Sequence, residues 1–156
     1  MQPFVIKIHK ALRKKQKTLA VAESCTGGLL SSFLTTLPGS SNYYILGVVA
    51  YGNKAKENIL KIPHSVIQKN GAVSKAVAEM MANSVRRLAK ADYGIGITGI
   101  AGPGGATPKK PTGTVFIAVI GPCKKISEKF SFKGNRNLVQ RQAALKALEL
   151  LQATLR

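Results

Sequence analysis

Residues 22–28, Ala-Glu-Ser-Cys-Thr-Gly-Gly, constrain the fold of this chain more than any other stretch. They lie between a short apolar run, 19–22, and a helical pattern that follows them. A strand that ends in small polar residues and glycines before a helix directs backbone N–H groups and the positive end of a helix dipole to one point. The stretch therefore predicts a turn that holds an anion or an oxyanion, with Ser24 or Cys25 as the nucleophile. A simpler interpretation is an architectural turn with Ser24 or Thr26 as a helix N-cap.

Strand and helix patterns alternate along the whole chain. Helices are predicted at residues 3–17, 26–37, 53–60, 63–69, 75–89 and 135–155. Strands are predicted at residues 19–23, 43–51, 92–98, 113–120 and 124–132. The second has the length and β-branching of a central strand, and the last two read as an antiparallel pair. This order predicts a three-layer α/β/α fold with a mixed, mainly parallel sheet of about five strands, in one domain over residues 1–156.

The distribution of apolar residues and cysteines bears on where the protein works. No apolar run approaches the ~18 to 20 residues that a membrane span needs, and the N-terminus has no apolar segment typical of a signal peptide. Cys25 and Cys123 lie far apart in the sequence, so reduced thiols are expected rather than a disulfide. We therefore expect a cytoplasmic protein without membrane contact.

The net charge is +18, from 24 lysines and arginines against 6 acidic residues. Such an excess raises the hypothesis of a nucleic-acid partner. Apart from a cluster in residues 7–17, however, the basic residues are spread along the chain, tryptophan is absent and aromatics make up only 6%. No interleaving of basic and aromatic residues suited to base stacking occurs. We do not expect nucleic-acid binding to be the main function, and we keep it as the alternative of a different class.

The inventory of reactive side chains makes several common mechanisms improbable. The chain has two histidines and six acids, and neither His9 nor His64 neighbours a second metal ligand in the sequence. This scarcity disfavours a metal site, a Ser-His-Asp triad and a pair of catalytic carboxylates, so no metal and no cofactor are expected. A hydroxyl or thiol nucleophile remains, with lysine or tyrosine as its proton acceptor.

Residues 51–56, Tyr-Gly-Asn-Lys-Ala-Lys, offer such an acceptor at the end of the second long strand. In a parallel sheet this end can lie beside the end of the first strand, where Ser24 lies. A lysine acts as a base only if burial or neighbouring cations lower its pKa from about 10.4. Spacing alone leaves Lys54 and Lys56 open as candidates, and equally as solvated residues of a first helical turn.

Several segments in register resemble the nicotinamide-nucleotide amidase family, which is the C-terminal domain of CinA-type competence and damage-inducible proteins. The segments are 22–28, 51–53 with Lys56, Gly-Ala-Val-Ser at 71–74, Gly-Ile-Ala-Gly-Pro at 99–103 with Lys110-Pro111, and Gly-Thr-Val at 113–115. The resemblance covers nearly the whole chain. It implies metal-independent hydrolysis of the carboxamide of nicotinamide mononucleotide to the acid mononucleotide and ammonia, in pyridine-nucleotide recycling. It also implies an α/β/α domain that forms a homo-oligomer.

The resemblance implies roles for particular residues. Tyr51, Asn53 and Lys56 fill the family pattern Tyr-x-Asn-x-x-Lys, with Lys56 as the general base and Tyr51 as the residue that relays or orients the proton. Ser24 is implied as the nucleophile, and Cys25 is its rival. The oxyanion is expected to be held by backbone N–H groups of Thr26, Gly27 and Gly28.

The substrate's 5′-phosphate also needs donors. The expected donors are Gly99, Ala101 and Gly102 of the glycine-rich loop, with Lys110, Arg136 and Arg141. The two arginines match a family segment Gly-Asp-Arg in which Asn135 here replaces the acid, and their alternative role is surface charge or subunit contact. Ala106, Lys109 and Thr112 also depart from the family's usual loop.

Two alternatives to an active stand-alone amidase remain at this point. Many family members carry the domain behind a nucleotide-hydrolysing domain, for which a chain of this length has no room, so we expect the stand-alone form. A catalytically silent relative that keeps the fold as an interaction module is one alternative. A basic nucleic-acid-binding protein is the other.

Overall fold

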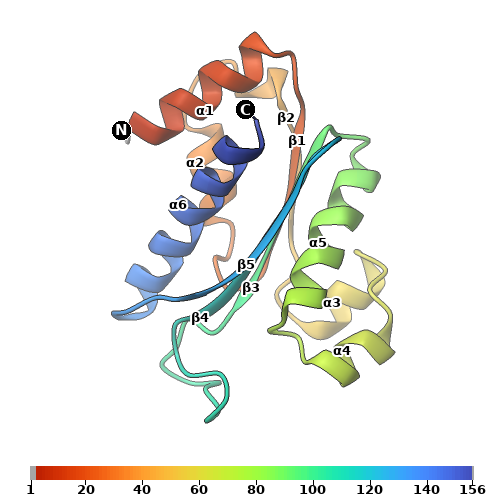
Figure 1. The fold of residues 1–156 in the computed structure, drawn as a ribbon, viewed down its shortest axis with the longest axis vertical. Coiled ribbons are helices and arrows are strands. Elements are labelled where there is room, and N and C mark those ends of the chain that lie inside the picture. The colour runs from red at the N-terminus through yellow and green to blue at the C-terminus, as the bar shows by residue number, and fades with distance from the viewer. Residues whose placement is uncertain (1–2, 156) are drawn as a thin grey trace.

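The computed structural model describes residues 3–155 and places one sheet between two layers of helices (Figure 1). The helices are α1 (Pro3–Lys14), α2 (Leu29–Thr35), α3 (Asn53–Asn58), α4 (His64–Asn70), α5 (Lys75–Leu88), α6 (Arg136–Thr154) and the 3-10 turn η1 (Ser40–Asn42). The strands are β1 (Leu19–Glu23), β2 (Tyr44–Val49), β3 (Tyr93–Gly99), β4 (Thr114–Ile120) and β5 (Lys125–Ser131). Along the described chain, no helix is both long and apolar enough to cross a membrane.

The strand order is β2-β1-β3-β4-β5. β1 runs parallel to both β2 and β3, whereas β4 and β5 are antiparallel to their neighbours. This confirms the mixed sheet, in which three of the strands run parallel. The carboxyl ends of β1, β2 and β3 consequently meet at one edge, where α/β sheets bind ligands.

One expectation about the sheet is wrong, because β2 lies at its edge rather than at its centre. Its side chains alternate between half-buried and exposed positions, and Ile45 and Val49 are about half exposed. The β-branched, apolar composition of this strand is typical of a central strand. Composition alone does not reveal that no strand within residues 3–155 pairs with its outer side.

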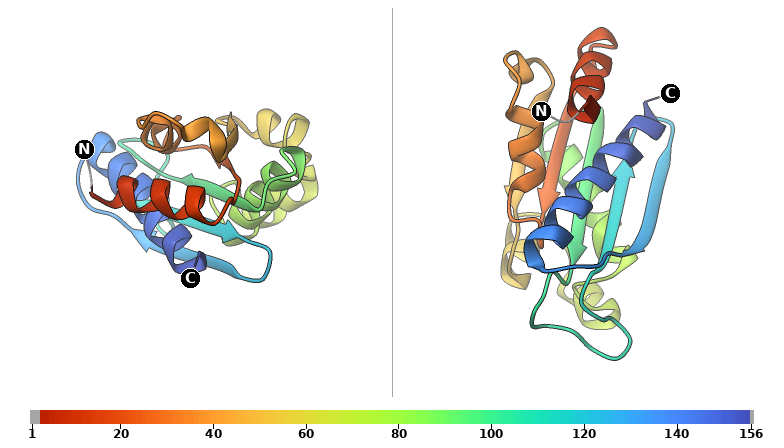
Figure 2. Two further views of the ribbon diagram at one scale, coloured as in Figure 1. Left: turned by 90° about the horizontal axis from the view of Figure 1, so that it is seen from above. Right: turned by 90° about the vertical axis from the view of Figure 1, so that its left-hand side faces the viewer.

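The helices form two layers, with α1, α2 and α6 on one face of the sheet and α3, α4 and α5 on the other (Figures 1 and 2). The first face holds the larger core, which includes Leu12, Leu34 and Leu148. On the second face α5 lies very close to β3, because a Cβ at Gly96 would stand 2.2 Å from the carbonyl oxygen of Ala78. Glycine is therefore required on β3 for the sheet and α5 to approach so closely.

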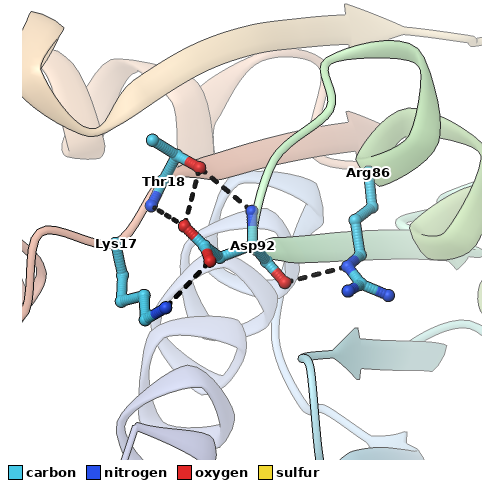
Figure 3. Close-up of polar contacts among 4 residues, drawn as sticks. All are labelled: Lys17, Thr18, Arg86 and Asp92. Carbon is cyan, nitrogen blue, oxygen red and sulfur yellow. Dashed lines mark hydrogen bonds and ion pairs between the residues drawn. The ribbon is translucent and has the colours of Figure 1, made fainter.

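The starts of β1 and β3 are joined by Asp92 (Figure 3). Its carboxylate accepts hydrogen bonds from the Thr18 N–H and hydroxyl and from Lys17 Nζ, while Arg86 Nε donates to its carbonyl. Burial works to raise the pKa of Asp92, but the hydrogen bonds from Thr18 and Lys17 outweigh it and lower that pKa. This junction fixes β1 against β3 at the edge opposite the carboxyl ends.

Most element bounds lie within three residues of those predicted. Ser74 is the N-cap of α5 as its spacing suggests, since its hydroxyl accepts the Val77 N–H at 3.3 Å. Helix α1 ends at Lys14, three residues earlier than predicted, and Gln16 adopts a positive φ of 51°. Helix α2 begins at Leu29, three residues later than predicted, and the cause lies in the turn that precedes it.

Candidate active site

A cleft of about 280 Å³ opens at the carboxyl ends of the parallel strands. Its walls come from the turn after β1, the connection from β2 into α3, the loop between α4 and α5, the loop after β3 and the first residue of α6. The expected site residues that line it are Ser24, Tyr51, Asn53, Lys56, Gly99, Ala101, Gly102 and Arg136. Thr26, Gly27, Gly28, Lys110 and Arg141 do not line it.

Glu23 shapes the turn that carries Ser24, and the sequence reasoning gave it no role. Its side chain is fully buried and accepts hydrogen bonds from the N–H groups of Gly28, Leu30 and Ser31 and from the Ser31 hydroxyl. The carboxylate thereby satisfies free donors at the start of α2, a role that side-chain caps usually fill. An acid three residues before the predicted helix start at residue 26 was the signal that could have revealed it.

The expectation that Gly27 and Gly28 hold an oxyanion is wrong. The Gly27 N–H donates to the Ser24 carbonyl at 3.0 Å, and the Gly28 N–H donates to Glu23 at 3.1 Å. Both glycines have positive φ, so the chain turns through them before α2 begins. Thr26 is buried outside the cleft, and its hydroxyl has no hydrogen-bond partner within residues 3–155.

Lys56 reaches Ser24 from the first turns of α3. Its side chain is 1% exposed, and Nζ lies 3.0 Å from Ser24 Oγ. Nζ also donates to the carbonyls of Ala50 at 2.9 Å and Tyr51 at 3.1 Å. Lys54 is exposed and outside the cleft lining. Of the two lysines that spacing left open, the structure therefore brings only Lys56 to the serine.

The surroundings of Lys56 make its amine easier to deprotonate than that of an exposed lysine. Burial lowers the pKa of Lys56, against a smaller raising effect from Cys25. A neutral amine has two N–H donors, which match the two carbonyls, and one lone pair, which can then accept the proton of the Ser24 hydroxyl. This geometry can convert serine into a nucleophile without histidine.

Cys25 lines the same cleft but is poorly suited to attack a substrate. Cys25 is only 4% exposed, and burial raises the pKa of its thiol to about 12. A thiol reacts as the thiolate, which this pKa makes scarce at neutral pH. The Cys25 carbonyl accepts a hydrogen bond from Gln140 Nε2 at 2.8 Å, which anchors the turn to α6.

Tyr51 and Arg136 meet at the mouth of the cleft. Arg136 Nη2 donates to the Tyr51 hydroxyl, and Nη1 donates to the Gly102 carbonyl at 2.7 Å. The Tyr51 side chain is 55% exposed, and its hydroxyl bonds to Arg136 rather than to Ser24 or Lys56. The group of Tyr51 that contacts Lys56 is its backbone carbonyl.

Two of the cations expected at the phosphate lie elsewhere. Lys110 Nζ donates to the carbonyls of Asn70 and Val73, so it fastens the long loop after β3 to the connection between α4 and α5. Arg141 is exposed on α6 and does not reach the cleft. Both residues are close in sequence to residues that line the cleft. Closeness in sequence does not show which way a side chain points.

The sequence reasoning also missed Thr98, a buried residue of the lining. It is 1% exposed, and its hydroxyl donates to the Ala72 carbonyl at 2.8 Å, which ties the end of β3 to the loop before α5. Residues 3–155 contain no group of three or more histidine, cysteine or acidic side chains that could hold a metal.

A second, roomier cleft of about 600 Å³ includes Lys17, Tyr93 and Cys123, near the starts of β1 and β3. It lies away from the paired serine and buried lysine. The chemistry therefore favours the smaller cleft as the candidate active site.

The fold and the cleft define an α/β/α domain with a serine and a buried lysine in contact at the ends of parallel strands. The family model of the CinA C-terminal domain matches residues 2–155, and the chain belongs to this family. It is 48% identical over 145 residues to a CinA-like protein of Anaeromyxobacter sp. (strain K), and 43% identical over 156 residues to one of Thermotoga maritima. These alignments cover 93% and 100% of this chain but 36% and 37% of the relatives, so the chain spans little more than a third of their length.

Solved structures agree with this assignment. A competence/damage inducible protein from Agrobacterium tumefaciens matches with a TM-score of 0.96 and 31% identity, over 98% of this chain and 94% of that one. A competence-damaged protein (CinA) superfamily protein from Escherichia coli matches with a TM-score of 0.91 and 34% identity, over 96% and 88% of the two chains. The three-layer fold is thus that of the family.

Proposed function

We propose that this domain hydrolyses the carboxamide of nicotinamide mononucleotide to nicotinic acid mononucleotide and ammonia, in pyridine-nucleotide recycling. The observation that supports this most is the 3.0 Å contact between Ser24 Oγ and the buried amine of Lys56. Burying a charged lysine without a counter-ion costs free energy, and groups with perturbed pKa values cluster at functional sites. Neither an interaction module nor a nucleic-acid-binding protein requires such a pair.

The proposed reaction has two halves. Ser24 Oγ attacks the carboxamide carbon while its proton passes to Lys56 Nζ. The tetrahedral intermediate then collapses, the C–N bond breaks, and Lys56 returns the proton to the nitrogen, which leaves as ammonia. In the second half Lys56 accepts a proton from water, whose oxygen attacks the ester carbon. The bond from that carbon to Ser24 Oγ then breaks and Lys56 returns the proton to Oγ, which releases the carboxylic acid and regenerates Ser24.

The oxyanion needs donors other than Gly27 and Gly28. The N–H groups of Cys25, Ala101 and Gly102 belong to residues that line the cleft, and none has a hydrogen-bond partner within the described chain. The N–H of the residue after a nucleophilic serine serves this role in other hydrolases. One well-placed donor contributes about 3–4 kcal/mol to lowering the barrier.

The mononucleotide part of the substrate is proposed to bind toward Arg136. Its guanidinium lies at the cleft mouth, uses two of its five N–H donors on Tyr51 and Gly102, and pairs with no carboxylate in residues 3–155. Such a group suits a phosphate. Asn53, on the lining beside Tyr51, is the proposed contact for the ribose.

The decisive experiment incubates the protein with nicotinamide mononucleotide and measures ammonia and the acid product. Ser24→Ala and Lys56→Met should each abolish most of the release, whereas Lys54→Met, the matched control on the same helix, should retain it. Cys25→Ala should also retain it. If folded wild-type protein releases no ammonia, the proposed function is wrong.

A further inference from the structure

The turn between β1 and α2, which carries Ser24, is held by a side chain from another layer of the fold. The Ser24 N–H donates to the Ile97 carbonyl on β3 at 3.0 Å, and the Ser24 carbonyl accepts the Gly27 N–H from within the turn. The next carbonyl, that of Cys25, accepts a hydrogen bond from Gln140 Nε2 on α6 at 2.8 Å. Among the described residues, no other side chain donates a hydrogen bond to a carbonyl of this turn.

The bond from Gln140 lies next to a backbone donor that the proposed reaction uses. The Cys25 N–H belongs to a residue of the cleft lining and has no hydrogen-bond partner within the described chain. Because each peptide unit is planar, fixing the carbonyls of Ser24 and Cys25 fixes the two planes on either side of the Cys25 Cα. The direction of the N–H between them, relative to Ser24 Oγ, therefore depends on Gln140.

Helix α6 holds a second wall of the cleft in the same way. Arg136 lies one turn before Gln140 on the same face of α6, and its Nη1 donates to the Gly102 carbonyl at 2.7 Å. The loop that contains Gly102 supplies the other free N–H groups of the lining, those of Ala101 and Gly102. One face of α6 thus fixes the turn after β1 relative to the loop after β3.

We infer that Gln140 is a positioning residue for the reaction, because its bond to the Cys25 carbonyl directs the Cys25 N–H toward the oxyanion and fixes the turn that carries Ser24. This inference rests on the proposed function. Gln140 does not line the cleft, so it acts through the turn and not on the substrate. A displacement of about 1 Å in an active site can lower the rate about 10²-fold, and removing one oxyanion donor lowers kcat by about 10²–10³.

Gln140→Met tests the inference, since methionine keeps the length of the side chain and removes the donor. We expect kcat for ammonia release to fall about 10- to 100-fold, because the oxyanion donor is loosened but not removed. KM should stay within about threefold of the wild-type value, because the proposed phosphate contact at Arg136 is intact. Gln140→Met that kept kcat within about threefold of wild type would contradict the inference.

Gln142→Met is the matched control on the same helix. Gln142 Nε2 also donates to backbone carbonyls, those of Lys133 at 2.8 Å and Leu138 at 3.1 Å, but neither belongs to the cleft lining. Chemical denaturation should therefore show at least as large a loss of stability for Gln142→Met as for Gln140→Met, while its kcat stays within about twofold of wild type. Equal losses of kcat in the two variants would show a general loosening of α6 and would overturn the inference.

A second assay separates the role of Gln140 from the identity of the substrate. Phenylmethylsulfonyl fluoride reports an activated serine: Ser24 Oγ attacks the sulfur, the S–F bond breaks, fluoride leaves, and the hydroxyl proton passes to Lys56 Nζ. Mass spectrometry should show that Gln140→Met is labelled about tenfold or more slowly than wild type and Gln142→Met at nearly the wild-type rate, with no label on Ser24→Ala.

The two assays together distinguish the two possible failures. If wild-type protein is labelled but releases no ammonia, the proposed substrate is wrong, and the labelling rates alone decide the role of Gln140. If wild-type protein reacts in neither assay, or if Gln140→Met is labelled as fast as wild type, the inference is wrong.

Discussion

Replacing Lys56 by methionine tests the catalytic role of the buried amine most directly. Methionine keeps the length of the side chain but has no proton acceptor. Ser24 Oγ is then left with the Tyr51 carbonyl at 3.4 Å as its remaining partner, which can accept the hydroxyl proton in a hydrogen bond but cannot remove it. General-base catalysis contributes about 10²–10⁴ in rate. We therefore expect kcat/KM for ammonia release to fall by about 10²–10⁴, or about 3–5 kcal/mol of barrier.

The pH dependence of activity and stability gives a second readout of the same group. Burial lowers the pKa of Lys56 from 10.5, so wild-type activity should rise with pH as the amine loses its proton. In the pH range between the folded and unfolded pKa values, the unfolded chain binds more protons, and the free energy of unfolding of the wild type should rise with pH. Lys56→Met should lack this rise, so its stability relative to wild type should be greatest at low pH and diminish toward pH 10.5.

The measurements are ammonia release against pH and chemical denaturation against pH, with Lys54→Met as the control. Lys54 is exposed two residues earlier on α3, so its variant makes the same side-chain replacement on the same helix without touching Ser24. If Lys56→Met kept kcat/KM within tenfold of wild type, or if both variants showed the same pH dependence, Lys56 would not be the base.

Three other residues give independent predictions. Glu23→Gln weakens four hydrogen bonds at the start of α2, and charge-assisted bonds contribute about 1.5–3 kcal/mol each, so denaturation should show a loss of about 2–4 kcal/mol. Arg136→Ala should raise KM for the mononucleotide about 10- to 100-fold and leave hydrolysis of the riboside nearly unchanged, whereas Arg141→Ala should alter neither. In thiol titration of the native protein, exposed Cys123 should react and buried Cys25 should not; a second reactive thiol before unfolding would contradict the burial argument.

The sequence predicted the layers and strand types because periodicity and chain order carry that information. Apolar repeats distinguish helices from strands, and short connections limit the topology. The position of β2 at the edge could not be predicted in this way. Whether a strand is central depends on which partner approaches its second side, and Ile45 and Val49 look the same in either case.

Within the site, the sequence located the residues better than their directions. Ser24 and Lys56 follow neighbouring parallel strands, so the topology alone placed them near each other. The prediction for the turn was wrong in detail because the Gly28 N–H donates to the Glu23 carboxylate and the Gly27 N–H donates to the Ser24 carbonyl. Lys110 is likewise close in sequence to residues that line the cleft, but its ammonium group donates hydrogen bonds to backbone carbonyls of another loop.

The scarcity of acidic residues bears directly on the chemistry of Lys56. A carboxylate within ~4–6 Å would stabilise the ammonium and raise its pKa, which would deprive Ser24 of a base. Among residues 3–155 no acidic side chain lines the cleft. Four of the six acids pair with other side chains, and Glu23 accepts hydrogen bonds from backbone N–H groups. Burial therefore lowers the pKa of Lys56 with no carboxylate at the amine to raise it, and only the smaller effect of Cys25 acts in the opposite direction. The composition that gives this chain its large positive charge is thus compatible with a neutral catalytic lysine, because the property that matters is the absence of a counter-ion at one buried atom.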